Sequence, residues 1–405
     1  MYQNLKSKLE LYKTGQIKKS CQEEKTGLDV HDIIEGSACS NDNGSCYVIE
    51  NRYPVTYLHG GCCLGDAQCA NMPSMRRVCR DLPLDANIED FLFLDTETTG
   101  LSGGTGTVAF LAGAGFFLGD EFVLRQYFMR DYDEEPAMLT ALDELLSDRK
   151  GLVTFNGKSF DWNLLQSRFT FNRMRPALKD PIHMDLLFPS RRIWRLKLES
   201  CRLTSLEENI LGEYRIDDIP GAQIPSIYFE YLDSRDATDI KRVIKHNELD
   251  ILSLVSLMVR ISCKLDNPLG EADGAQELLG LGRIFEANGE YATVIHCFEN
   301  CMESEILSVK DAASRRLSNI YKRSGNYSRA VEHWESMLAD SKMTDIFPLI
   351  ELAKYYEHRE KDVSKAIDLV EKAMKISSRV GFMNNLYYND LKKRIERLKR
   401  KAGRK

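Results

Sequence analysis

Residues 91–101 read FLFLDTETTGL, a short apolar run that ends in acidic and small residues. A continuous apolar run of this length, followed by turn residues, predicts a buried strand. Two similar runs follow it, VAFLAGAGFF at 108–117 and EFVLRQYFM at 121–129, and short segments containing glycine separate the three. Three strands joined by short turns predict an antiparallel meander.

Helical and extended segments alternate after this meander. We expect a helix at about 135–147, a strand in LVTFN at 152–156, a second helix at about 159–171 and a long helix at about 236–263. Strands that come first and are followed by alternating helices and strands favour a mixed α/β sheet flanked by helices.

From residue 274 onward the sequence carries a helical repeat. The segments IFEANGEYATVIHCFENCM, IYKRSGNYSRAVEHWESML and YYEHREKDVSKAIDLVEKAM align so that Val294, Ala330 and Ala366 stand 36 residues apart. Each segment reads as helix–turn–helix, and the pattern resembles a divergent tetratricopeptide array. Three such units are enough to bury a continuous core. A generic helical bundle with accidental periodicity is the alternative.

The front of the chain looks different from both of these regions. Residues 1–88 are rich in Gly, Asn, Asp, Ser and Cys, which predicts an irregular leader. Six of the 11 cysteines lie between Cys39 and Cys79, but no two of these six are spaced as C-x2-C. Free thiols are therefore favoured over a zinc or iron–sulfur site.

Charge and hydropathy limit the possible functions. The 405 residues carry a formal net charge of −6, which disfavours a protein that coats DNA non-specifically. The longest apolar stretch is too short to span a bilayer, and the start of the chain lacks an apolar signal region, so we expect a cytoplasmic protein with no membrane partner.

Three separate segments carry carboxylates suited to metal binding. Asp95 and Glu97 are two residues apart on the predicted strand and so point to the same face. Asp161 begins or closely follows the start of a helix, while His246 and Asp250 share one face of the long helix. Like charges that lie close together need a cation, and hard divalent ions prefer oxygen ligands. Taken singly, each segment has an ordinary explanation. Asp95 and Glu97 could end a strand at a solvent-exposed turn, helix N-termini favour carboxylates such as Asp161, and His246 and Asp250 could form a solvated polar face.

Together, these segments carry a family resemblance. DTETTGL at 95–101, FNGKSFD at 155–161 and the helix with His246 and Asp250 resemble the three motifs of the DEDD (DnaQ-like) 3′–5′ exonucleases, which have a ribonuclease H-like fold. The longer stretches DTETTGLSGGTGT, HMDLLFPSRRIW, DIPGAQIP and HNELDILSL resemble the YprB-like proteins, which are predicted exonucleases with tetratricopeptide repeats behind the nuclease domain.

The resemblance implies roles for particular residues. Its four metal-binding acids fall on Asp95, Glu97, Asp161 and Asp250, which would hold two Mg2+ or Mn2+ ions. His246 stands where one branch of the family has its water-activating tyrosine, so it is either the general base or a residue that orients a phosphate. Asp185 is the substitute ligand if Asp161 is misassigned. The segment that meets the terminal nucleotide falls on Thr98, Thr99, Gly100 and Leu101, with Asn156 in support.

The resemblance also implies an overall organisation. We expect an irregular leader at 1–88, a ribonuclease H-like exonuclease domain at 89–266, tetratricopeptide-like repeats at 274–390 and a basic tail at 391–405. The expected activity is metal-dependent 3′–5′ hydrolysis of single-stranded DNA or RNA, and the repeats would bind a protein or nucleic acid. A non-catalytic nucleic-acid-binding scaffold and a structure-specific endonuclease are the alternatives.

Basic residues provide two candidate contacts with a nucleic-acid backbone. Residues 165–202 contain nine Lys or Arg and three Asp or Glu, with Trp194 and several Phe among them. Residues 391–405 contain nine basic residues and one acid. Either stretch could follow a phosphate backbone, but a solvated helix surface explains both as well.

Overall fold

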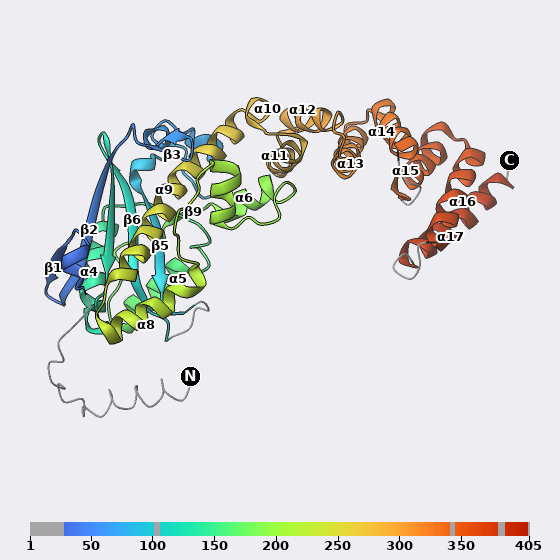
Figure 1. Cartoon of the computed structure of the whole chain (residues 1–405). Helices are drawn as coiled ribbons and strands as arrows, with labels where there is room; N and C mark the ends of the chain where they lie inside the picture. Colours follow the sequence, from blue (N-terminus) through green and yellow to red (C-terminus); the bar gives the residue numbers. More distant parts are fainter. Residues whose placement is uncertain (1–27, 101–105, 341–344, 380–384, 404–405) are drawn as a thin grey trace. The chain divides into compact units, whose positions relative to one another are not determined.

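The computed structural model describes residues 28–100, 106–340, 345–379 and 385–403. The chain forms two compact units, which are described separately (Figure 1). The first comprises residues 1–72, 81–187 and 202–259, and the second comprises residues 73–80, 188–201 and 260–405. Within the described residues, no helix is both long enough and apolar enough to cross a lipid bilayer.

A seven-stranded mixed sheet forms the centre of the first unit, with the strand order β1-β2-β7-β6-β5-β8-β9. All neighbouring pairs from β1 to β5 are antiparallel, whereas β8 and β9 continue the sheet in parallel with β5. The strands are β1 (Ser37–Asn41), β2 (Gly44–Pro54), β5 (Phe91–Thr98), β6 (Ala109–Leu118), β7 (Glu121–Phe128), β8 (Gly151–Thr154) and β9 (Ile182–Asp185). This arrangement confirms both the predicted mixed sheet and the meander of β5, β6 and β7.

Helices from later in the chain complete this unit. The main ones are α4 (Glu135–Leu146), α5 (Asp161–Phe171), α8 (Ile224–Ser234) and the long α9 (Thr238–Asp266), of which residues up to Val259 belong to the first unit. The shorter elements of this unit are α2 (Val30–Ile33), β3 (Leu58–His59), β4 (Cys62–Cys63) and α7 (Leu203–Leu206), whereas α3 (Met72–Met75) and α6 (Leu187–Trp194) belong, apart from their first residues, to the second unit. A π-helical turn, Glu207–Leu211, follows α7.

Helix α9 packs unusually close to strand β6 because two glycines lie beneath it. A Cβ atom on Gly113 would lie 2.1 Å from Oδ1 of Asn247, and one on Gly115 would lie 2.7 Å from Cγ2 of Ile251. Any side chain at these positions would push the helix away from the sheet. The alternation of Ala and Gly in β6 therefore sets the distance between the strand and the helix that carries His246 and Asp250.

The prediction of an irregular leader over 1–88 is wrong for residues 37–54. These residues form β1 and β2, and β2 pairs along its length with β7. The misleading signal was the cluster Asn41–Gly44, which looked like part of a loop but is the turn of a β-hairpin. The edge strand β1 is mostly polar or exposed, so it lacks the apolar alternation that identifies a half-buried strand.

The second unit is built from helices that pair in sequence. The pairs are α11 (Ala275–Ala287) with α12 (Tyr291–Cys301), α13 (Leu307–Arg323) with α14 (Tyr327–Asp340) and α15 (Phe347–Tyr355) with α16 (Val363–Arg379), while α10 (Pro268–Glu271) precedes them. The repeat positions Val294, Ala330 and Ala366 are fully buried. Their burial agrees with helical hairpins, while the assignment to the tetratricopeptide class stays a prediction.

The predicted basic tail at 391–405 needs correction, because most of it belongs to a packed helix. Helix α17 runs from Asn385 to Ala402 and lies against α16. Arg394, Arg397 and Lys401 each form an ion pair with Glu357, whose side chain is fully buried, at 3.0, 2.7 and 2.7 Å. The acid that organises these charges lies well before them in sequence, so local composition could not reveal the contact.

We predict that Gly113→Ala destabilises the protein by about 3 kcal/mol, because overpacking costs ~1–3 kcal/mol and the buried amide of Asn247 would also lose hydrogen bonds. Urea unfolding followed by circular dichroism measures the change. Gly221→Ala is the matched control, since a Cβ there has no heavy atom within 4 Å. Equal stability of the two variants would contradict the close approach of α9 to β6.

We predict that Glu357→Gln lowers the stability of the helical unit by ~1.5–3 kcal/mol at pH 7, as expected for hydrogen bonds to a charged group. Burial alone would raise the pKa of Glu357, but the hydrogen bonds from Lys401 and Arg397 lower it to about 2 from its ordinary 4.5. The stabilisation is therefore complete above pH 4.5 and disappears as the pH falls toward 2.

Thermal unfolding of both proteins between pH 7 and pH 2 provides the measurement. Glu371→Gln serves as control, because the ion pair of Glu371 with Lys399 is solvent-exposed and should contribute little. A wild-type advantage over Glu357→Gln that persists unchanged at pH 2 would contradict the assignment.

Candidate active site

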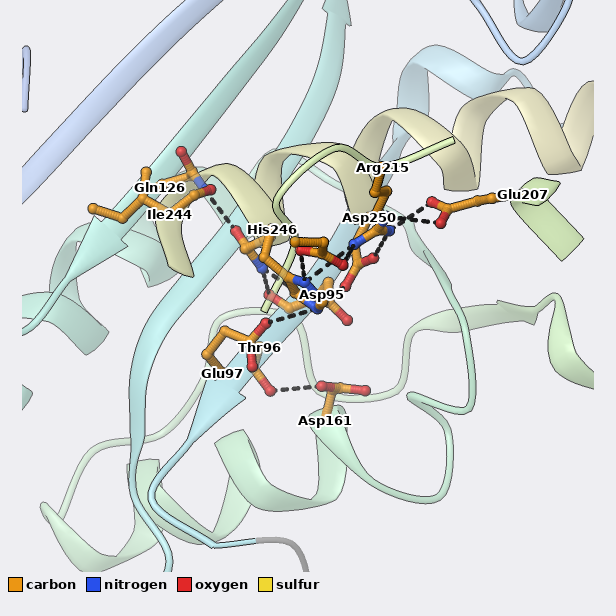
Figure 2. Close-up of polar contacts among 12 residues, drawn as sticks. Asp95, Thr96, Glu97, Gln126, Asp161, Glu207, Arg215, Ile244, His246 and Asp250 are labelled. Atoms are coloured by element: carbon orange, nitrogen blue, oxygen red, sulfur yellow. Dashed lines mark hydrogen bonds and ion pairs between the residues drawn. The ribbon is translucent and has the colours of Figure 1, made fainter. Parts of the chain in front are cut away.

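The predicted acids come from three elements of the first unit and meet at the end of strand β5 (Figure 2). Asp95 and Glu97 lie on β5, Asp161 is the first residue of α5, and His246 and Asp250 lie one helical turn apart on α9. The period of two along a strand and the i, i+4 spacing along a helix bring each pair to one face. The structure therefore brings together residues that are up to 155 positions apart in the sequence.

Asn247 fixes helix α9 against the sheet at this point. Its Nδ2 donates to Oδ2 of Asp95 at 2.9 Å and to the backbone oxygen of Asp95 at 3.3 Å. Its Oδ1 accepts from Nε2 of Gln126 at 2.9 Å, and Gln126 also donates to the backbone oxygen of Ile244 at 2.7 Å. Asn247 is fully buried, so this network links β5, β7 and α9 without water and sets the direction in which His246 and Asp250 point.

A hydrogen bond from the neighbouring strand residue Thr96 holds Asp161. Oγ1 of Thr96 donates to Oδ1 of Asp161 at 2.5 Å. Burial raises the pKa of Asp161 to about 6, and the hydrogen bond from Thr96 limits that rise. Thr96 therefore favours the ionised carboxylate that a metal ligand requires.

The acids in this pocket repel one another. Burial raises the pKa of both Asp95 and Glu97 well above their ordinary values, and the negative charges of Asp250 and Asp161 raise them further. Among the described residues, no hydrogen-bond donor contacts the carboxylate of Glu97, and its one ion-pair partner is His246, whose Nε2 lies 3.8 Å away. The pocket therefore carries negative charge that the protein itself does not fully neutralise.

Arg215 supplies part of the missing positive charge, and its role was not anticipated from the sequence. Its guanidinium donates to Oδ1 of Asp250 and to both carboxylate oxygens of Glu207, the latter at 2.6 and 2.7 Å. Asp218, three residues further on, lies 3.4 Å from the same guanidinium. The quoted segment DIPGAQIP begins at Asp218, but spacing alone does not show that Arg215 and Asp218 point into the pocket.

His246 lies between two sets of carboxylates. Its Nδ1 is 2.7 Å from Oδ1 of Asp218 and 3.2 Å from Nη1 of Arg215. Its Nε2 is 3.4 Å from Oδ2 of Asp250 and 3.8 Å from Oε1 of Glu97. The imidazole is nearly buried, so these contacts determine its orientation.

Hydrogen bonds connect His59, in the cysteine-rich leader, to the site. Nε2 of His59 lies 2.9 Å from Oγ of Ser253, and that hydroxyl donates 2.5 Å to Oε1 of Glu207. Glu207 in turn binds Arg215. A chain of buried hydrogen bonds thus runs from the leader to the guanidinium that contacts Asp250, and sequence reading assigned no role to any of its first three members.

The predicted substrate residues Thr98, Thr99 and Gly100 directly follow Glu97 in the sequence, and Thr98 is the last residue of β5. The hydroxyl of Thr98 donates to the backbone oxygen of Gly100 at 2.8 Å, and that of Thr99 accepts from the backbone N–H of Val108 at 3.0 Å. Both hydroxyls therefore shape the turn between β5 and β6. Leu101, the remaining residue of that predicted segment, lies outside the described residues.

Asn156 lies in the turn between β8 and α5, and Asp185 is the last residue of strand β9, which pairs with β8. Asn156 is exposed with a φ of 69°, and its backbone N–H donates to Oδ1 of Asp185 at 2.8 Å. Asp185 also accepts from the backbone N–H groups of Lys158 and Leu187. Its oxygens are engaged with backbone donors, which favours Asp161 over Asp185 as the ligand contributed by this part of the chain.

The basic stretch at 165–202 does not form one free patch. Arg168 is buried and bound to Glu135 at 2.5 Å, and Lys197 is bound to Asp273 and Glu277. Several others are exposed, and they belong to both units: Arg173, Arg175, Lys179, Arg191, Arg192, Arg195 and Arg202.

The donor atoms of the pocket fit a divalent cation. One ligand atom each from Glu97, His246 and Asp250 lies within 4.8 Å of the other two. Besides burial, the charge of Asp161 raises the pKa of Asp95 and Glu97, and the charge of Glu97 raises that of Asp95, so these carboxylates lie near one another. Asn247 and Thr96 each engage one oxygen of Asp95 and Asp161, respectively. Within the described chain, Arg215 is the one Lys or Arg side chain that forms an ion pair with any of these four acids.

Comparison with known proteins places the chain in a family. Residues 92–262 match the family model of the RNase H superfamily. Over 361 residues the chain is 32% identical to the uncharacterized protein YprB of Bacillus subtilis (strain 168), a match that covers 88% of this chain and 86% of that protein. The chain therefore belongs to the YprB family, and it carries a domain of the RNase H superfamily.

Proposed function

We propose that this protein is a metal-dependent 3′–5′ exonuclease that hydrolyses phosphodiester bonds at the 3′ end of single-stranded nucleic acid. The observation that carries the proposal is the meeting of Asp95, Glu97, Asp161 and Asp250 at the end of β5, in a domain of the RNase H superfamily. That superfamily supports a nuclease in general. The choice of the 3′ end rests on the resemblance of the three motifs to the DEDD exonucleases.

The four acids would hold two Mg2+ or Mn2+ ions. Such ions lower the pKa of a bound water and stabilise negative charge on the attacking and leaving oxygens of the phosphodiester. The protein contributes the placement of the ligands: Asn247 orients Asp95, Thr96 orients Asp161 and Arg215 orients Asp250. Ligands that are held by such contacts need little reorganisation to bind the ions.

Other residues would serve the substrate. The turn Thr98–Gly100 and the exposed Asn156 lie beside the acids, where the end of a strand could enter. His246 could act in two ways, either by accepting a proton from the attacking water or by binding an ion together with Glu97 and Asp250. A protein or nucleic-acid ligand for the helical repeats remains part of the proposal.

The direct test uses 5′-labelled single-stranded DNA and RNA with Mg2+ or Mn2+. We expect the wild type to give a ladder that shortens from the 3′ end, and Asp95→Asn to lose at least about a hundred-fold in rate, because even changes outside the ligand sphere of metal sites cost ~10–100-fold. Asp148→Asn, a change of the same kind at an exposed position, should cleave at the wild-type rate.

Three results would overturn the proposal in different ways. Internal fragments from the wild type would show an endonuclease. The absence of any metal-dependent cleavage by pure, folded wild type would support a non-catalytic nucleic-acid-binding protein. Full activity of Asp95→Asn would remove Asp95 from the metal site.

A further inference from the structure

Three donor atoms in the pocket are arranged as the ligands of one ion. Nε2 of His246 lies 3.4 Å from Oδ2 of Asp250 and 3.8 Å from Oε1 of Glu97, and all three atoms lie within 4.8 Å of one another. Ligands that each stand ~2.0–2.2 Å from a single cation are about 3–4 Å apart. The spacing therefore suits shared coordination with only small movements.

The hydrogen bond on the other side of the ring indicates which nitrogen is free. Nδ1 of His246 lies 2.7 Å from Oδ1 of Asp218, and because a carboxylate accepts, Nδ1 carries the proton. Nη1 of Arg215 lies farther from Nδ1, at 3.2 Å. It has another acceptor in Oδ2 of Asp218 at 3.4 Å, so it does not require Nδ1 as an acceptor. Nε2 faces the carboxylates of Asp250 and Glu97, so a cation bound between these three groups would take the place of a proton on Nε2.

A histidine that binds a metal through one ring nitrogen usually donates the N–H of its other ring nitrogen to a carboxylate. Two residues of the segment between the π-helical turn and α8 make contacts of this kind with the donor groups. Asp218 orients His246, and Arg215 holds Oδ1 of Asp250, which leaves Oδ2 of Asp250 directed toward His246. One segment thus orients two of the three donor groups.

We propose that His246 binds metal directly and forms, with Glu97 and Asp250, a mixed nitrogen–oxygen centre that prefers Mn2+ to Mg2+. Imidazole is a good ligand for transition metals, whereas Mg2+ prefers oxygen ligands and retains its waters. This inference rests on the proposed metal-dependent function and decides one part of it: His246 binds the ion that lowers the pKa of the attacking water and does not accept the proton of that water. Asp218 is a positioning residue in this centre.

Pulsed electron paramagnetic resonance of the full-length protein with Mn2+ and no nucleic acid tests the proposal. Electron spin-echo modulation should show coupling to 14N from a coordinated imidazole. His246→Gln should abolish this coupling, while His31→Gln, the same change at an exposed histidine, should preserve it. Because the measurement involves no turnover, it separates metal binding from catalysis.

Affinities measured by calorimetry give a second readout. We expect His246→Gln to weaken Mn2+ binding by about 10–100-fold and Mg2+ binding by less than about threefold. Asp218→Ala should weaken Mn2+ binding by about tenfold and yet retain the 14N coupling, since the ligand itself is still present.

The outcomes distinguish this inference from the proposed function. Bound Mn2+ without 14N coupling, in a wild type that still degrades nucleic acid, would overturn only the role of His246 as a ligand. Equal losses of Mn2+ and Mg2+ affinity in His246→Gln would overturn the metal preference. Failure of the wild type to bind either ion would overturn the proposed function as well.

Discussion

The buried amide of Asn247 is the contact on which the rest of the site depends. It donates to Asp95 on β5 and accepts from Gln126 on β7, and it fits because Gly113 on β6 has no side chain. A buried amide must satisfy its donors and acceptor, so it tolerates little rotation of the helix that carries it. Because His246 and Asp250 lie beside Asn247 on the same helix, fixing the rotation of α9 also fixes the direction in which they point.

Electrostatic repulsion between the carboxylates destabilises this arrangement. Burial raises the pKa values of Asp95, Glu97 and Asp161, and neighbouring negative charges raise those of Asp95 and Glu97 further. Arg215 reduces the repulsion at Asp250, and Thr96 reduces it at Asp161. The remaining negative charge would attract a divalent ion. The repulsion between the carboxylates therefore both destabilises the site and suits it for metal binding.

Sequence reading was most successful where a local rule decides the outcome. The apolar runs of β5, β6 and β7, the helix that begins at Asp161 and the i, i+4 pair on α9 all follow from periodicity. It failed where distant residues decide. Strand β2 becomes recognisable only through its pairing with β7, and strand β1 only through its pairing with β2. Helix α17 is anchored by Glu357, a residue of the preceding repeat. Composition alone assigned both segments to irregular or solvated chain.

The same division applies within the site. The acids could be identified because carboxylates at characteristic spacings resemble known motifs. Asn247, Arg215, Asp218 and His59 could not, because their importance comes from the atoms they meet after folding rather than from any pattern around them. The residues that orient these acids lie largely on loops and helices whose mutual placement no local sequence signal encodes.

Crystals of the full-length protein grown with Mn2+ offer the most direct test of whether these acids form a metal site. An anomalous difference map recorded near the manganese absorption edge would locate each ion independently of the refined side chains. The geometry predicts a peak within ~2.0–2.6 Å of oxygens from both Glu97 and Asp250. A map with no peak in this pocket, at Mn2+ concentrations that saturate other nucleases, would contradict it.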